Sequence, residues 1–232
     1  MSAEEKWYPP KAAWLGNAHG CPPFDVLNQM LYKTVEDHPS NADHSQIIGK
    51  LMLIGRTYSA SIERRQTNKH EDERQALEVF IAAADSIARS NVEALLGCIK
   101  PSARLTPERI DEAAAVHLEL CTALTSASHQ ENSSLASKYL HFHRPNFFPI
   151  VDSLVRAGWS WVMDAKDESY AGYTTLGKVA RYRDWCEKCL AMQEDIRIQL
   201  GHEVSLRQVD NYLLSVMSLD GHGNIGLPQL PG

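Results

Sequence analysis

The chain has 232 residues, of which 44% are hydrophobic and 22% are charged, a composition that excludes a mostly disordered protein. Its formal net charge of −6 does not favour nucleic-acid binding through bulk electrostatics. The longest apolar run, IIGKLMLI, contains Gly49 and Lys50 and is too short to cross a bilayer, so we expect no membrane partner. MSAEEKWYPP lacks the basic and apolar regions of a secretory signal, and we expect a cytoplasmic protein.

Apolar residues recur at steps of three and four along most of the chain, and no run of strict alternation reaches the length of a strand. The sequence therefore predicts an all-α protein. One stripe lies within residues 41–70, where five basic and two acidic side chains give a local net charge of +3. Its members are Ile47, Leu51, Ile54, Tyr58 and Ile62. Further helices are expected near 24–36, 72–89, 91–99, 134–143, 153–164 and 175–199.

Two helix starts carry capping signals. Thr106 followed by Pro107 is typical of an N-cap and a first-turn proline, and apolar positions follow from Ile110 onward. Ser205 and Gln208 have the spacing of a capping box. We expect both to begin helices.

Signals for a metal or cofactor are weak. Cys186 and Cys189 form a CxxC pair, but the surrounding residues have helical periodicity, and an iron–sulfur cluster usually needs four thiolates. The favoured interpretation is that these thiols pack in the core. His141 and His143 are two residues apart on a predicted helix, so they point about 200° away from each other and cannot chelate one metal. We expect no metal and no cofactor.

The most informative segment is SSLASKYLHFHRPNFFPIVDSLV, residues 133–155. Leu135, Tyr139 and Phe142 share one face of a helix that Pro145 ends. The apolar bend that follows, residues 147–150, leads to Asp152 before the next helix. One hypothesis for Asp152 is an ordinary N-cap, which contributes about 1 kcal/mol. The other is a carboxylate held beside apolar surface for catalysis.

This order of helix, apolar turn ending in PIVD and helix resembles the catalytic core of the helix-hairpin-helix DNA glycosylases, the superfamily of endonuclease III, the adenine glycosylase MutY and 8-oxoguanine glycosylase. In that family the turn places a catalytic aspartate at a helix N-terminus, which corresponds to Asp152. The stretch LMLIGRTYSASIERR, residues 51–65, is similar to the family helix whose polar kink fills the gap left by a flipped base.

Two features of the family are missing. Its glycine hairpin should precede Leu135, where this chain has LTSASHQENSS. Counting back from Pro145, the position of the Schiff-base lysine of the bifunctional members falls on Asn132 or Ser133. The resemblance therefore implies a catalytic site with Asp152 and with Asn132 at the lysine position, and simple hydrolysis to an abasic site.

The resemblance also implies a DNA partner that contains a damaged or modified base. Arg56 is the favoured residue for insertion into the gap, Tyr58 is the alternative, and Trp159 is expected to wall a base pocket. Hypermodified phage bases such as glucosylated hydroxymethylcytosine, which some bacterial members with this layout excise in defence, are one substrate class that the resemblance implies. Phosphate contacts are expected from Lys138, His141, Arg144 and Arg156.

We expect a single domain over residues 1–232 with two helical lobes around a DNA-binding cleft. One lobe would hold residues 45–145, and the other residues 1–44 and 146–232. The alternative function is a non-catalytic helical module that binds a nucleic acid or another partner. A helical metal hydrolase is disfavoured, because the chain has no suitably spaced set of His and Asp residues.

Overall fold

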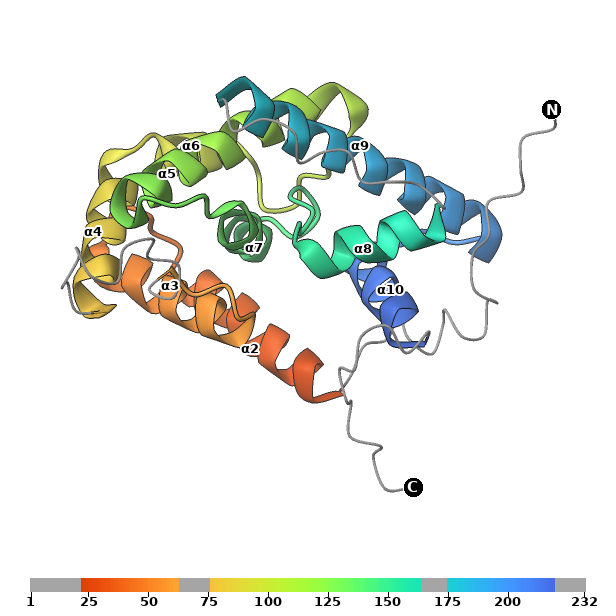
Figure 1. Cartoon of the computed structure of the whole chain (residues 1–232), viewed down its shortest axis with the longest axis horizontal. Helices are drawn as coiled ribbons and strands as arrows, with labels where there is room; N and C mark the ends of the chain where they lie inside the picture. The colour runs from red at the N-terminus through yellow and green to blue at the C-terminus, as the bar shows by residue number, and fades with distance from the viewer. Residues whose placement is uncertain (1–21, 63–75, 164–174, 220–232) are drawn as a thin grey trace.

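The computed structural model describes residues 22–62, 76–163 and 175–219, and every regular element within these ranges is a helix (Figure 1). The prediction of an all-α protein is therefore confirmed. Residues 72–75 and 164 of the predicted helices lie outside the described residues. No described helix is both long enough and apolar enough to span a membrane. The elements are α2 (Pro22–Asp37), α3 (His44–Thr57), α4 (Ala76–Arg89), α5 (Val92–Gly97), the 3-10 helix η2 (Pro107–Arg109), α6 (Ile110–Ser128), α7 (Ser133–His143), α8 (Ser153–Val162), α9 (Thr175–Leu200) and α10 (Leu206–Leu219).

The helix α7 lies at the centre of the molecule and is seen end-on in Figure 1. It packs against α2, α3 and α6, and all its residues from 135 to 143 are buried. Because this helix also carries polar side chains, those groups need partners inside the protein. The hydroxyl of Ser137 accepts the N–H of Val151 at 3.1 Å and lies within donating distance of the carbonyls of Ser134 and Val151. This contact fixes the apolar bend against α7.

A buried lysine joins α3 to α7. Lys50 is almost completely buried, and its ammonium donates to the backbone carbonyl of Ser40 at 2.7 Å and to Asn41 Oδ1 at 3.1 Å. It also lies 3.2 Å from His143 Nε2. Burial lowers the pKa of Lys50 to about 8, and the negative charge of Glu93 partly opposes this shift. His143 therefore serves this internal network.

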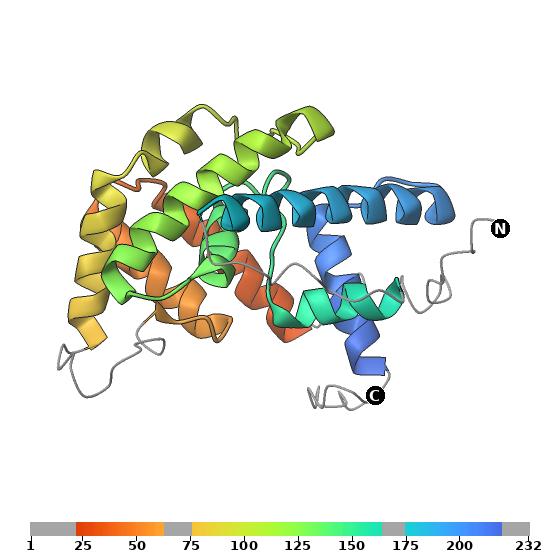
Figure 2. The ribbon, with the colours of Figure 1, turned by 45° about the horizontal axis from the view of Figure 1, so that its top comes forward.

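The helices α8 and α10 approach each other closely. A Cβ atom placed on Gly158 of α8 would lie 2.4 Å from the carbonyl oxygen of Leu213 on α10. Only glycine allows the two backbones to come this near. Figure 2 shows α9 crossing α6, with α10 meeting α9 and lying against α8.

The two capping predictions have different outcomes. The capping box before α10 is confirmed: the N–H of Ser205 donates to Gln208 Oε1, and the N–H of Gln208 donates to Ser205 Oγ. Thr106 does occupy the position before a helix that Pro107 begins, but that helix is the short η2, which precedes α6. The prediction that its side chain caps the helix is wrong, because the hydroxyl pairs with Glu108 and makes no capping bond.

Contacts cross the boundary between the two predicted lobes. The helix α2, which belongs to the predicted second lobe, packs against α3 and α7 of the first. Likewise, α9 of the predicted second lobe packs against α6 of the first. The division into residues 45–145 and the remainder stays a prediction.

Candidate functional site

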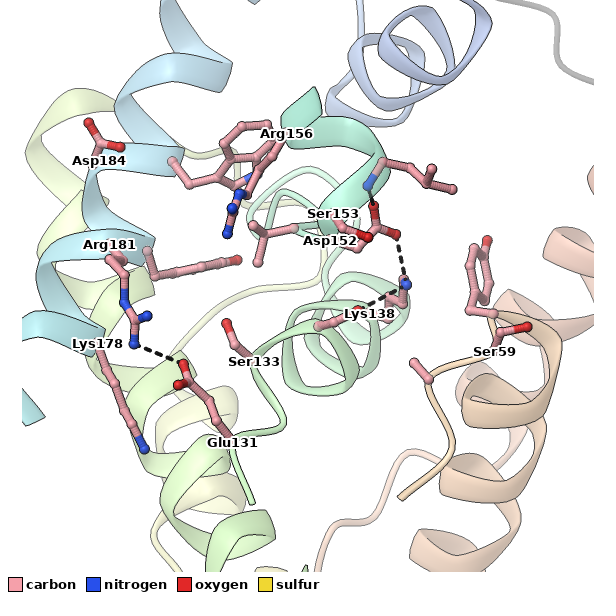
Figure 3. Close-up of a pocket in the computed structure, with 17 residues that line it drawn as sticks. Ser59, Glu131, Ser133, Lys138, Asp152, Ser153, Arg156, Lys178, Arg181 and Asp184 are labelled. Atoms are coloured by element: carbon pink, nitrogen blue, oxygen red, sulfur yellow. Dashed lines mark hydrogen bonds and ion pairs between the residues drawn. The ribbon is translucent and has the colours of Figure 1, made fainter. Parts of the chain in front are cut away.

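A pocket of about 430 Å³ lies where the end of α3, the N-terminus of α7, the start of α8 and the first half of α9 meet (Figure 3). Its volume is within the range typical of small-molecule sites. Three aromatic side chains, Tyr58, Tyr182 and Trp185, contribute to its walls. The remaining lining is largely polar and charged.

Asp152 is both a helix cap and a pocket residue. Its Oδ1 accepts hydrogen bonds from the N–H groups of Leu154 and Val155, each at 3.0 Å, which caps α8. Its Oδ2 lies 2.9 Å from Lys138 Nζ. The carboxylate is 19% exposed and lines the pocket. The two hypotheses drawn from the sequence are thus compatible in one geometry.

The charge of Asp152 is held by its neighbours. Burial acts to raise its pKa, but the charge and hydrogen bond of Lys138, together with the N–H groups of Val155 and Leu154, outweigh this effect and lower the pKa below its usual value. Asp152 is therefore ionised at neutral pH. A fixed negative charge faces the pocket.

Lys138, for which the sequence suggests a phosphate contact, forms the ion pair with Asp152. Only 3% of its side chain is exposed, and its ammonium also donates to Ser134 Oγ at 3.1 Å. It lies 5.3 Å from the centre of the Tyr58 ring. A carboxylate, a hydroxyl and an aromatic face together compensate for the burial of the charge.

A second carboxylate, that of Asp210, interacts electrostatically with Tyr58. The guanidinium of Arg207 is 6.0 Å from the centre of the Tyr58 ring and forms an ion pair with Asp210. Burial raises the pKa of Asp210 to about 6, although the charge of Arg207 opposes this shift. Tyr58 is itself held by a hydrogen bond from its hydroxyl to Asn28 Oδ1.

The helix α9 holds the apolar bend in place. The hydroxyl of Tyr182 donates to the carbonyl of Pro149 at 2.9 Å, and Trp185 Nε1 donates to the carbonyl of Ile150 at 2.7 Å. The ring of Tyr182 also stacks on His117 at a centroid distance of 3.7 Å. Burial lowers the pKa of His117 to about 4, so this histidine is neutral at pH 7.

Basic side chains of α9 lie across the pocket from the Asp152–Lys138 pair (Figure 3). Arg181 Nη2 donates to Glu131 Oε1 at 2.9 Å, and Lys178 also lines the pocket. No motif or capping signal in the sequence marks Lys178, Arg181 or Glu131. One signal is nevertheless present, because residues 178, 181, 182 and 185 have the spacing of one helix face.

Part of the predicted site comes together in the pocket, which is lined by Tyr58, Lys138, Asp152 and Arg156. Arg56 and Trp159 do not line it. Arg56 lies exposed in the last turn of α3, and the ring of Trp159 packs 4.3 Å from the ammonium of Lys188.

Asn132, His141 and Arg144 also lie outside the pocket, because each is engaged by the protein itself. Asn132 is fully buried, and its amide nitrogen donates to Ser128 Oγ and to the carbonyl of Gln130. His141 donates from Nδ1 to the carbonyl of Phe148 and pairs through Nε2 with the hydroxyl of Tyr32. The guanidinium of Arg144 donates to the backbone carbonyls of residues 96, 99 and 143, the first of which lies in the last turn of α5 and the second just after that helix.

Within the described ranges, no group of three or more His, Cys, Asp or Glu side chains is placed to hold a metal ion. Cys121, Cys186 and Cys189 are buried free thiols, and Cys98 is an exposed one. No protein-family model, no curated protein and no solved structure matches this chain.

Proposed function

We propose that this protein is a monofunctional DNA glycosylase, which hydrolyses the N-glycosidic bond of a damaged or modified base and leaves an abasic site. The observation that carries this proposal is the ionised carboxylate of Asp152, fixed at the start of α8 and exposed to a pocket with aromatic walls.

The chemistry needs such a group. Cleavage of an N-glycosidic bond develops positive charge on the sugar, and a preorganised carboxylate beside C1′ stabilises that charge. Two backbone N–H groups and Lys138 hold Asp152 in one orientation, so little reorganisation is needed during the reaction. The same carboxylate can orient the attacking water.

The pocket also suits a base that has left the helical stack. A flipped base is usually held between aromatic or apolar side chains. Tyr58 and Tyr182 belong to different helical segments and both line the pocket, as does Trp185. Tyr58 is the partly exposed ring of the three and offers a flat surface of the kind on which bases stack, whereas Tyr182 and Trp185 are almost completely buried and close the apolar wall.

Lys138 supports a hydrolytic rather than a lyase reaction. A Schiff-base nucleophile requires a neutral amine. Here Nζ is engaged by Asp152 and Ser134, and its side chain is almost completely buried. In this proposal Lys138 orients Asp152 and keeps it ionised.

One observation favours the alternative, a non-catalytic module that binds nucleic acid or another partner. Asp152 makes both hydrogen bonds of an ordinary N-cap. A cap requires no reaction, and the basic side chains of the pocket would then serve binding alone.

The test is to incubate the protein with bacterial and phage DNAs that differ in base modification, including DNA with glucosylated hydroxymethylcytosine, and to measure abasic sites with an aldehyde-reactive probe. We expect abasic sites in one class of DNA and no strand cleavage. Binding without base release in every DNA would favour the non-catalytic module. Borohydride trapping of a covalent adduct that requires Lys138 would contradict the monofunctional assignment.

A further inference from the structure

The basic side chains at the α9 side of the pocket are not needed for the chemistry at Asp152. Lys178 and Arg181 are three residues apart on α9, and Tyr182 and Trp185 continue the same face. All four line the pocket. The helix thus presents two cations and two aromatic rings to one space.

We propose that Lys178 and Arg181, together with Arg156 of α8, form a subsite for the DNA phosphate next to the nucleotide held at Asp152. This inference rests on the proposed function, and it names a phosphate-binding surface in place of the glycine hairpin that the sequence lacks.

The arrangement of charges supports an anion at this position. Each carboxylate that lines the pocket has a basic partner: Asp152 pairs with Lys138, Glu131 with Arg181, and Asp184 with Lys188. Among the residues that the structure describes, none of the ion pairs involves Lys178. The α9 side of the pocket therefore has positive charge that its own carboxylates do not neutralise.

Arg181 is oriented before any ligand arrives. Its Nη2 donates to Glu131 and its Nε to the carbonyl of Gly177, and 15% of its side chain is exposed. A guanidinium that is already fixed loses little conformational entropy when it binds an anion. Figure 3 shows Lys178 and Arg181 beside Glu131, with Ser133 between them and the Asp152–Lys138 pair.

The N-terminus of α7 adds to the positive electrostatic potential of the pocket. Ser133 and Ser134 begin that helix and line the pocket, so the positive end of the helix dipole faces the same space. The sugar would lie at Asp152 and its phosphate toward α9, which is the order of groups within one nucleotide. A chain with a net charge of −6 has to rely on such local contacts to bind DNA.

The experiment measures DNA binding by fluorescence anisotropy at several salt concentrations, with a short labelled DNA that contains a tetrahydrofuran abasic analogue. The test variant is Lys178→Gln, and Arg156→Gln is a second. The matched control is Arg183→Gln, which removes a cation from the same helix outside the pocket, where Arg183 pairs with Asp111. Thermal unfolding confirms that each variant is folded.

We expect Lys178→Gln to weaken binding by about fivefold to tenfold at ~0.1 M salt, and to reduce the slope of log K against log salt by about one. Arg183→Gln should leave both quantities near those of the wild type. Equal values for Lys178→Gln and Arg183→Gln would overturn the proposal. Competition by inorganic phosphate at concentrations as low as those of the DNA would also overturn it, because the site would then be one for a small anion.

The outcomes separate this inference from the proposed function. If the wild type binds DNA through Lys178 but releases no base, the phosphate subsite stands and the glycosylase assignment fails. If the wild type releases a base and Lys178→Gln binds normally, the glycosylase assignment stands and the subsite fails. A wild type that does not bind DNA contradicts both.

Discussion

The ammonium of Lys138 lies 2.9 Å from one carboxylate oxygen of Asp152, while the other oxygen accepts two N–H groups from the first turn of α8. One aspartate therefore has two separable duties, since capping uses its oxygen lone pairs and catalysis would use its charge.

The first prediction separates these duties with Asp152→Asn. Asparagine caps a helix nearly as well as aspartate, so the variant should keep the cap and lose stability only through the ion pair with the buried Lys138. It lacks the negative charge, so base release should fall on the order of a hundredfold or more. Thermal unfolding and an abasic-site assay measure the two effects. Asp152→Ala is the comparison, and it should be about 1 kcal/mol less stable than Asp152→Asn, because it loses the cap as well. Full base release by Asp152→Asn would exclude a catalytic role for this residue.

The second prediction concerns the ion pair. In Lys138→Gln, burial still acts on Asp152 but the opposing positive charge is gone, so the pKa of Asp152 should rise. A carbon-13 NMR titration of the carboxyl group measures this pKa directly. The acid limb of base release should move to higher pH with it. Ser134→Ala, which removes a hydroxyl and keeps the ion pair, is the control. An unmoved titration in Lys138→Gln would show that Lys138 does not set the charge of Asp152.

The third prediction tests the contact between α8 and α10. Gly158→Ala would place a Cβ atom 2.4 Å from the carbonyl of Leu213, so the backbones must separate. We expect a loss of about 1–3 kcal/mol in the free energy of unfolding. Gly49→Ala is the matched control, because no atom lies within 4 Å of the added Cβ and alanine favours the helix by roughly 0.5–1 kcal/mol. Urea unfolding measures both, and similar stabilities would contradict the close approach.

The fourth prediction concerns acid stability. Burial lowers the pKa of His117 to about 4 and that of His141 to about 3, and it lowers the pKa of His143 well below its usual value. In the unfolded chain these groups titrate near pH ~6.5, so below that pH the unfolded state binds more protons and the folded state loses stability. Asp210 acts in the opposite sense, since its pKa of about 6 lets the folded state bind a proton that the unfolded state releases.

The net difference is about two protons, which corresponds to a loss of roughly 3 kcal/mol per pH unit between about pH 6 and pH 5. Urea unfolding at a series of pH values measures the slope. His117→Phe keeps a ring against Tyr182 without a titrating group. The difference in bound protons between the unfolded and folded states should therefore fall by about one, and the slope should fall in proportion. His202→Gln, at an exposed position, is the control. A slope that His117→Phe leaves unchanged would contradict this account.

Much of the fold follows from local sequence. The helices are predictable because their apolar spacing is visible within each segment, and Asp152 is predictable as a cap because it directly precedes an apolar helix. Its pocket partner Lys138 lies within the same short segment, although nothing in the spacing alone indicates the ion pair.

The surroundings of several polar residues could not be predicted from the sequence, because their partners come from distant parts of the chain. Arg144 has the chemistry of a phosphate contact, but it bonds to carbonyls 45 and 48 positions away. His141 bonds to a hydroxyl 109 positions away. In the same way, Lys178 and Arg181 reach the pocket only because α9 packs over the apolar bend. A periodic pattern identifies a helix face but does not say what that face will meet.

The two hydrogen bonds from α9 to the carbonyls of Pro149 and Ile150 have a consequence for the order of assembly. Their donors, Tyr182 and Trp185, follow their acceptors by 33 and 35 positions. During synthesis the bend that carries Asp152 therefore leaves the ribosome before the side chains that anchor it. The bend gains these two anchors only after α9 has docked, so a nascent chain has no complete pocket until that helix has been made.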